Sequence, residues 1–102
     1  MLKGELVNTI SERELLRWAA RNHIHLGIHQ KRRLRDMVER DILPPRLCIS
    51  NGKWEFPNVA VKCLRIYKKL MGYPRRKIAE ETRPLILADQ EKRLRNRQSQ
   101  KA

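Results

Sequence analysis

Basic side chains dominate the chemistry that this sequence offers. The 102 residues include 24 Lys and Arg against 11 Asp and Glu, which gives a formal net charge of +13 and a pI near 10.7. A small domain needs a net charge of only about 2–8 to stay in solution. The excess therefore predicts a polyanionic partner, with nucleic acid ahead of an anionic membrane surface.

The first concentration of charge lies in residues 30–40, where the acids Asp36 and Glu39 accompany five basic side chains. Gln and Arg can make paired hydrogen bonds to base edges, and we predict this role for Gln30 and Arg33. Lys and further Arg side chains hold phosphates, which position a protein without specifying sequence. The predicted contacts with the DNA major groove are Gln30, Lys31, Arg32, Arg33 and Arg35. An ordinary solvated helix face is the alternative.

A second basic stretch contains no acidic residue between Glu55 and Glu80. An ordinary surface mixes charges of both signs. Three cations follow Pro74 at the expected start of a helix, where they oppose the helix dipole unless an anion such as phosphate binds there. The predicted contacts with the DNA backbone, which need not share one face, are Lys62, Arg65, Lys68, Lys69, Arg75, Arg76 and Lys77.

Metal binding and catalysis have weaker support. His23, His25 and His29 lie in one connection, but a structural zinc site needs four ligands and only Cys48 is near them in the sequence. Cys63 falls on an apolar helical seam, where a cysteine is ordinarily part of the core. The chain contains no glycine-rich phosphate loop and no hydrolase or metalloprotease motif. We therefore expect no enzyme activity, no catalytic residue, no metal and no cofactor.

Helical periodicity places residues 30–40 on the second of two helices. Ser11 and Glu14 form a capping-box pattern that begins the first helix. A short connection leads to the second helix, whose apolar side chains recur on one stripe while most basic side chains fall elsewhere. Pro44 and Pro45 follow this helix and end it, because proline cannot donate a hydrogen bond into a helix.

A change to a period-two pattern predicts a β-hairpin around the Asn-Gly pair at 51–52, since both residues tolerate positive φ. Trp54 and Phe56 alternate on the returning strand, and we expect both to pack against helices rather than to stack on bases. Arg46 and Lys53 are the predicted phosphate or minor-groove contacts of this hairpin.

Prolines divide the rest of the chain. Pro57 is expected in the first turn of a third helix, which carries an apolar seam at spacings of four, three and four residues. Pro74 opens a fourth, short helix, and Pro84 separates it from the last segment. The expected organisation is an N-terminal arm over residues 1–10, one domain over 11–83, and a basic helix or disordered tail over 84–102.

The resulting order of helix, helix, hairpin, helix and helix is that of a winged helix-turn-helix domain, in a mainly α class. Three segments resemble the DNA-binding domain of MerR-type regulators. Residues 33–45 are similar to the family's recognition helix, and residues 51–57 to its glycine-aromatic wing. Residues 64–78 are similar to the stretch that ends in Gly-Phe-Ser and an isoleucine. Together the resemblance covers about residues 11–82.

The resemblance implies a protein that reads DNA with its second helix, supported by the wing, and a homodimer joined through a C-terminal coiled coil. The sequence departs from the family at Asp36 and Met37, where aromatics are usual, at Asp41, where a glycine is usual, and at Trp54, which replaces the wing arginine. No effector domain follows, so a truncated chain and a stand-alone protein of the excisionase kind both stay open.

These patterns predict sequence-specific binding of double-stranded DNA and a role in transcription regulation. With neither a signal peptide nor an apolar run of ~18–20 residues, we expect a cytoplasmic, nucleoid-associated protein of a bacterium or phage, without membrane contact or a small-molecule effector. One alternative is an architectural DNA-binding protein of the excisionase or phage-packaging kind. Another is an RNA-binding protein, against which the few aromatic side chains argue, and the last is a protein-interaction adaptor.

Overall fold

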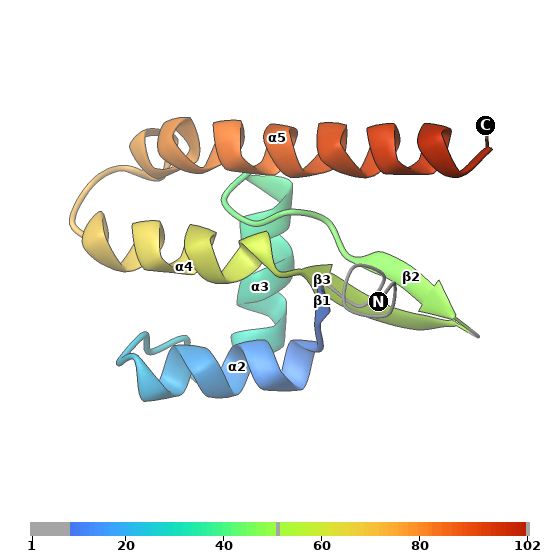
Figure 1. Ribbon diagram of the computed structural model, residues 1–102. Helices are drawn as coiled ribbons and strands as arrows, with labels where there is room; N and C mark the ends of the chain where they lie inside the picture. Colours follow the sequence, from blue (N-terminus) through green and yellow to red (C-terminus); the bar gives the residue numbers. More distant parts are fainter. Residues whose placement is uncertain (1–8, 51, 102) are drawn as a thin grey trace.

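A computed structural model describes residues 9–50 and 52–101 of the chain (Figure 1). This part is mainly helical, with a small antiparallel sheet of three strands. The predicted succession of helix, helix, hairpin and helix is confirmed up to residue 69. The elements in chain order are β1 (Thr9–Ile10), α2 (Glu12–Arg21), α3 (Gln30–Glu39), β2 (Leu47–Ser50), β3 (Lys53–Pro57), α4 (Val59–Lys69) and α5 (Arg75–Lys101).

The first two helices begin where the sequence predicts. Oγ of Ser11 accepts the backbone N–H of Glu14 at 3.1 Å and so caps α2. On α3, Leu34 and Met37 are buried while the basic side chains stay exposed, as the apolar stripe indicates. The connection between the two helices turns at Gly27, whose φ of +79° favours glycine. The amphipathic pattern of α3 thus presents its cations to solvent.

The sheet contains a strand that the sequence did not reveal. Thr9 and Ile10, expected in an N-terminal arm, form β1 and pair with the end of β3. Oγ1 of Thr9 also donates a hydrogen bond to Oε1 of Glu55 at 2.7 Å. The strand order is β1-β3-β2, so β3 is central. Residues 1–8 of the expected arm, and Asn51 of the expected turn, lie outside the described residues.

Pro57 was expected to open a helix, but it ends β3 opposite Thr9, and α4 begins at Val59. Proline has no N–H to donate, and this position lies beyond the part of β3 that pairs with β2. A strand end tolerates proline for this reason. A residue without an N–H group is therefore tolerated at a strand end as well as at a helix start. The sequence pattern alone does not distinguish these two positions for Pro57.

The C-terminal region corrects another expectation. A short helix and a separate segment beyond Pro84 were predicted, but α5 is one helix from Arg75 to Lys101, with Pro84 inside it. Proline removes the hydrogen bond to the carbonyl four residues earlier. Glu80 and Pro84 are both exposed, so water can replace the donor that the carbonyl of Glu80 loses. Of the two predicted alternatives for residues 84–101, the structure shows the helix.

One core joins all the helices to the sheet. Leu15, Leu34, Phe56, Leu64 and Ile78, which come from five different elements, are almost completely buried. On α4 the side chains turned most fully inward are Ala60, Cys63 and Leu64, whereas Val59, Ile66 and Leu70 of the predicted seam are only half-buried. The core fixes the positions of α3, the hairpin and α5 relative to one another.

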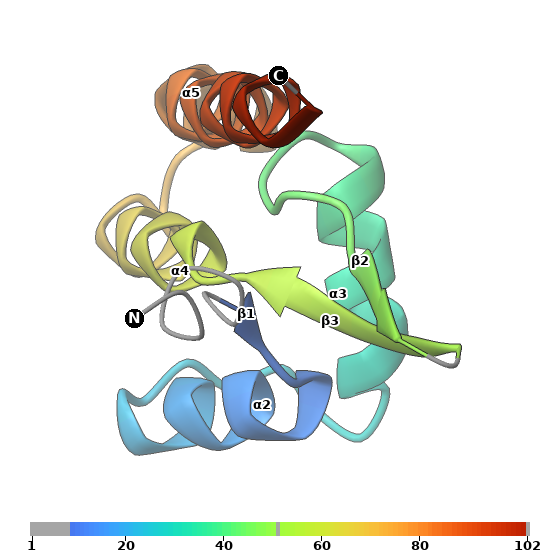
Figure 2. The ribbon, with the colours of Figure 1, turned by 45° about the vertical axis from the view of Figure 1, so that its right-hand side comes forward.

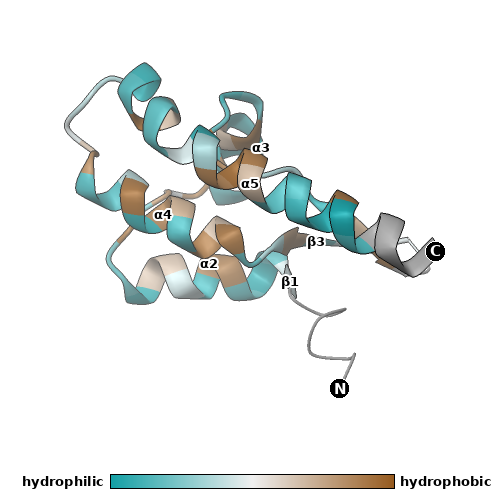
Figure 3. Cartoon of the chain, turned by 45° about the horizontal axis from the view of Figure 1, so that its top comes forward, coloured by the Kyte–Doolittle hydropathy of each residue, from teal (hydrophilic) through white to brown (hydrophobic). Residues whose placement is uncertain are grey.

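Figures 1 and 2 show α4 between α2 and α5, with α3 crossing on another side of the molecule. The hairpin of β2 and β3 extends beyond α2 and α4, toward the side to which α5 also runs (Figure 1). Apolar segments of α2 and α4 face each other, whereas the second half of α5 is mostly hydrophilic (Figure 3). Within residues 9–50 and 52–101, none of the helices has both the length and the apolar character that crossing a bilayer requires.

Candidate nucleic-acid interface

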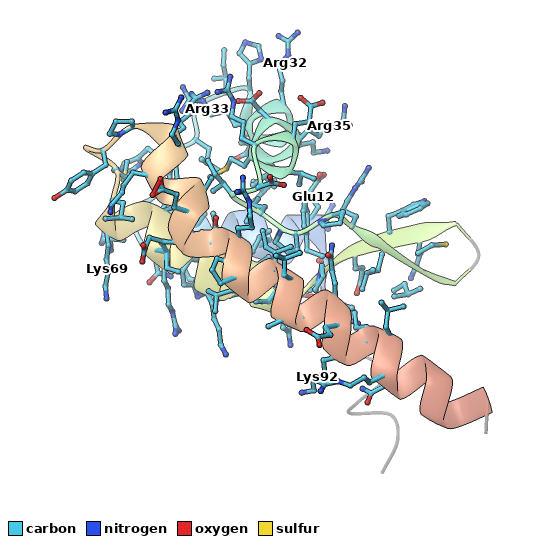
Figure 4. The ribbon with its side chains drawn as sticks, turned by 90° about the horizontal axis from the view of Figure 1, so that it is seen from above. Glu12, Arg32, Arg33, Arg35, Lys69 and Lys92 are labelled. Atoms are coloured by element: carbon cyan, nitrogen blue, oxygen red, sulfur yellow. The ribbon has the colours of Figure 1, made fainter. Side chains whose placement is uncertain are left out.

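Three arginines fan out from the exposed side of α3. Arg32 points directly away from the body of the molecule, Arg33 points to the side on which α5 begins, and Arg35 points to the side of the hairpin (Figure 4). The spread follows from the helix itself, because successive residues are rotated by about 100°. Together with Gln30 and Lys31 in the first turn, these arginines form the surface that we call the α3 face.

The α3 face keeps its positive charge within the described part of the chain. In the part of the chain that the structure describes, Lys31, Arg32, Arg33 and Arg35 form no ion pair with a carboxylate. The first turn of α3 contains no acidic residue, and its N-cap His29 makes no side-chain hydrogen bond to the helix. The positive end of the helix dipole therefore adds to the charge of the side chains.

A hollow lies at this end of the helix. Ile28, just before it, is an apolar side chain whose surface is 93% exposed. Cationic side chains and the N–H groups of a helix start can bind a phosphate, and an exposed apolar side chain can contact the adjoining sugar or base. The hollow is lined by Ile28, His29, Gln30, Lys31, Arg32 and Arg35.

Asp36 connects α3 to the start of α5. Its Oδ2 lies 3.1 Å from Nε of Arg40 and 3.2 Å from Nη1 of Arg75. The sequence predicted that the cations at the start of α5 need an anion, and Asp36 supplies one for Arg75. Arg76 and Lys77 are exposed beside it and form no ion pair within the described residues. Arg75 is therefore partly neutralised, whereas its two neighbours keep their full charge.

The hairpin flanks the other side of α3. Arg46 and Lys53, the predicted contacts of this element, are both exposed. Trp54 was expected to pack against helices, but 53% of its surface is exposed, whereas Phe56 is buried as predicted. Trp54 is two residues nearer the tip of the hairpin, where the core covers less of its ring. In Figure 2 the hairpin and α3 lie on the same side of the molecule, and the hairpin projects past α3.

The predicted backbone contacts of α4 lie elsewhere. All four cations are exposed, and Lys69 is on the opposite side of α5 from Arg32, Arg33 and Arg35 (Figure 4). The guanidinium of Arg65 stacks over the Trp18 ring of α2 at 5.8 Å from its centre. We call the surface formed by these four residues the α4 face: Lys62, Arg65, Lys68 and Lys69. The predicted site residues thus divide between two surfaces.

Sequence reasoning did not assign Trp54 and Ile28 to the site. Their exposure was the missing information, and the one available signal was the position of Trp54 close to a hairpin turn. A two-stranded hairpin extending past its supporting helices leaves the side chains near its tip without a core to enter. An apolar side chain that remains exposed is more informative than one that is buried.

The Cys63 thiol is shielded by the core. Burial, and to a smaller extent the Asp89 carboxylate, raises the pKa of the Cys63 thiol to about 12. A thiol with so high a pKa is a poor nucleophile at neutral pH. Among the described residues, no three His, Cys, Asp or Glu side chains gather as a metal site would require.

Comparison with known proteins finds no matching family model, no matching curated sequence and no matching solved structure.

Proposed function

We propose that this chain binds double-stranded DNA sequence-specifically and regulates transcription, with the α3 face in the major groove and the hairpin as a wing. The proposal depends on one observation: Arg32, Arg33 and Arg35 fan out from a single exposed helix without ion pairs in the described residues. The winged helix-turn-helix arrangement and the regulatory role are those that the MerR-type resemblance implies.

The dimensions of α3 suit the groove. An α-helix with its side chains is about 10–12 Å across, and the major groove of B-DNA is about 12 Å wide. A helix held there turns its outermost side chain toward the base edges and its flanking side chains toward the two phosphate walls. The directions of the arginines favour Arg32 as the base contact, in place of the Arg33 that the sequence pattern suggested, together with Gln30 at the start of the helix. Arg33 and Arg35 then serve as phosphate contacts.

Two flanking elements extend the proposed contact. On one side the hairpin offers Arg46, Lys53 and the exposed Trp54 to the DNA backbone or the adjacent minor groove. On the other side the start of α5 offers Arg76 and Lys77. Contacts on both walls of a groove fix the register of the central helix, which is what base readout requires.

The first experiment measures binding to labelled random-sequence duplex DNA by fluorescence anisotropy at a series of salt concentrations. We expect the logarithm of affinity to fall with the logarithm of salt concentration with a slope of about −4 to −8. The R33Q/R35Q variant, which removes the two proposed phosphate contacts, should lose about 2 from the magnitude of that slope. The R13Q/R17Q variant, with the same charge change on exposed positions of α2, should lose much less.

Base readout needs a second measurement. After selection of a preferred site, Arg32→Ala should weaken binding to that site by about 1–3 kcal/mol and to random DNA by much less. An equal loss on both DNAs would make Arg32 a phosphate contact. Absence of binding at low salt, or tighter binding to structured RNA, would contradict the proposal. Strong bending of the selected site would indicate an architectural role instead of regulation.

A further inference from the structure

The α4 face is a second basic surface that the proposed DNA contact leaves unused. Lys62, Arg65 and Lys69 are spaced three and four residues apart, so they form one stripe along the helix, with Lys68 at its edge. The helix contains no acidic residue, and all four cations are exposed. None of the four forms an ion pair within residues 9–50 and 52–101.

Within the described residues, no acidic side chain of the neighbouring helices forms an ion pair with α4. Acidic side chains occur on both, but the Asp89 carboxylate of α5 is bonded to Arg93 at 2.9 Å, and Glu14 of α2 is exposed without an ion pair to α4. Lys92 of α5 projects to the same side as Lys69 (Figure 4). The Trp18 ring holds one face of the Arg65 guanidinium, which leaves its N–H edge available to an oxyanion.

The spacing of the stripe matches a nucleic-acid backbone. From residue 62 to residue 69 a helix rises about 10 Å, and one DNA strand carries a phosphate every ~3.4 Å of its axis. With α4 parallel to the duplex axis, the stripe therefore spans about three phosphate steps of one strand. Lysine and arginine on a flexible stem neutralise phosphates without reading sequence.

One duplex cannot occupy both basic surfaces. Arg32, Arg33 and Arg35 lie on one side of α5 and Lys69 of the α4 face on the other (Figure 4), and the backbone extends 26 × 21 Å across its two shorter axes. DNA has a persistence length of about 150 base pairs and does not curl around a body this narrow at small cost. A duplex in contact with α3 therefore leaves the α4 face open to another polyanion.

We propose that the α4 face is a second, sequence-independent binding site for duplex DNA, through which one chain joins two DNA segments. This inference depends on the proposed function of the α3 face. Joining two segments requires only one protein chain, because both surfaces belong to the same chain. The proposal gives a use to the α4 part of the acid-free stretch between Glu55 and Glu80, which the contact at α3 does not explain.

The test is a capture assay with the full-length chain. One duplex carrying the preferred site is fixed to beads, protein is added, and retention of a second, labelled random-sequence duplex is measured at increasing salt. The K62Q/K69Q variant should retain about tenfold less of the labelled duplex, since two phosphate contacts are lost, while it still binds the fixed duplex. The R13Q/R17Q variant matches its charge change and should retain as much as the wild type.

Each of the other possible results rejects a different part of the proposal. Capture that is equally strong in K62Q/K69Q would overturn the proposal and indicate self-association of chains that each hold one duplex. Binding of the fixed duplex without any capture by the wild type would also overturn it, and would leave the α3 face as the single DNA site. Failure to bind the fixed duplex at all would reject both the inference and the proposed function.

Discussion

Oδ2 of Asp36, in the middle of α3, lies 3.2 Å from Nη1 of Arg75, the first residue of α5. The same carboxylate oxygen accepts a hydrogen bond from Nε of Arg40 at 3.1 Å. One acidic side chain thus connects the proposed recognition helix to the start of the C-terminal helix. It also places a negative charge beside an otherwise basic surface, where it opposes the approach of phosphate.

Removing that charge should strengthen DNA binding. Asp36→Asn takes away one negative charge and releases Arg40 and Arg75, so we expect a salt slope steeper by about 1 and a higher affinity at low salt. The free energy of unfolding should fall by no more than about 1 kcal/mol, because exposed ion pairs contribute little. Anisotropy and urea denaturation measure the two quantities. Glu91→Gln, with the same charge change far along α5, is the control, and an unchanged affinity in D36N would place the DNA elsewhere.

A buried hydroxyl should contribute measurably to stability. Oγ1 of Thr82 on α5 donates to the backbone carbonyl of Asp41 at 2.7 Å and is completely buried. Thr82→Val leaves that carbonyl without its donor, which should lower the free energy of unfolding by about 1–3 kcal/mol in a urea titration. Thr82→Ser keeps the hydroxyl and should recover part of the loss. If T82V were as stable as the wild type, the hydrogen bond would not anchor α5 to the end of α3.

The backbone at Asp41 should favour glycine. Its φ is +61°, in the left-handed region, and its carboxylate pairs with Arg83 at 3.2 Å. Asp41→Gly and Asp41→Ala both lose this exposed ion pair, but only alanine keeps a Cβ in the strained conformation. We expect D41G to be about 1 kcal/mol more stable than D41A in thermal or urea denaturation. Equal stabilities would contradict the left-handed backbone at this position.

The sequence predicted the helix starts at Ser11 and near Gln30 because capping residues and apolar spacing are local features. It did not predict β1, because the pairing of Ile10 with Phe56 joins segments far apart in the chain. Continuity of α5 through Pro84 was missed for a related reason. The buried Thr82 and Ile86 hold the helix against the core on both sides of the proline, and that packing is tertiary information.

The candidate site shows the same division. Periodicity identified the cations of α3 as solvent-facing, and the structure agrees. Arg33 points toward α5 and Arg35 toward the hairpin. The positions of these two elements depend on tertiary packing, which a local sequence pattern does not predict. The separation of Lys69 from Arg32 has the same origin, because only the packing of α4 against α2 and α5 sets it on another side.

The two cysteines should differ strongly in reactivity. Cys48 is exposed and Cys63 is buried, with a pKa raised to about 12 from an ordinary value of 9.0. A disulfide reagent should therefore modify one thiol quickly in the native chain and the second only after unfolding, and Cys48→Ser should abolish the fast phase. Rapid modification of Cys63 would show that the core opens readily.

Cys63 also predicts a pH dependence of stability. Below pH 9.0 the thiol is protonated in both the folded and the unfolded chain, so its contribution is constant there. Above that pH the unfolded chain ionises while the buried thiol stays neutral, and stability is lost as the pH rises toward the folded pKa. The free energy of unfolding should fall less steeply above pH 9.0 in Cys63→Ala than in the wild type. Equal slopes would mean that the thiol is not held neutral.

Trp54 should report directly on the hairpin's contact with DNA. The chain contains two tryptophans, so Trp18→Phe leaves Trp54 as the only indole, and its exposed ring should be quenched readily by acrylamide. If the hairpin lies against the duplex, added DNA should reduce that quenching, because the ring loses contact with solvent. Trp54→Phe is the matched control, since its one indole, Trp18, lies under Arg65 and reports on the α4 face instead of the hairpin. Unchanged quenching of Trp54 at saturating DNA would remove the hairpin from the interface while leaving the α3 contact intact.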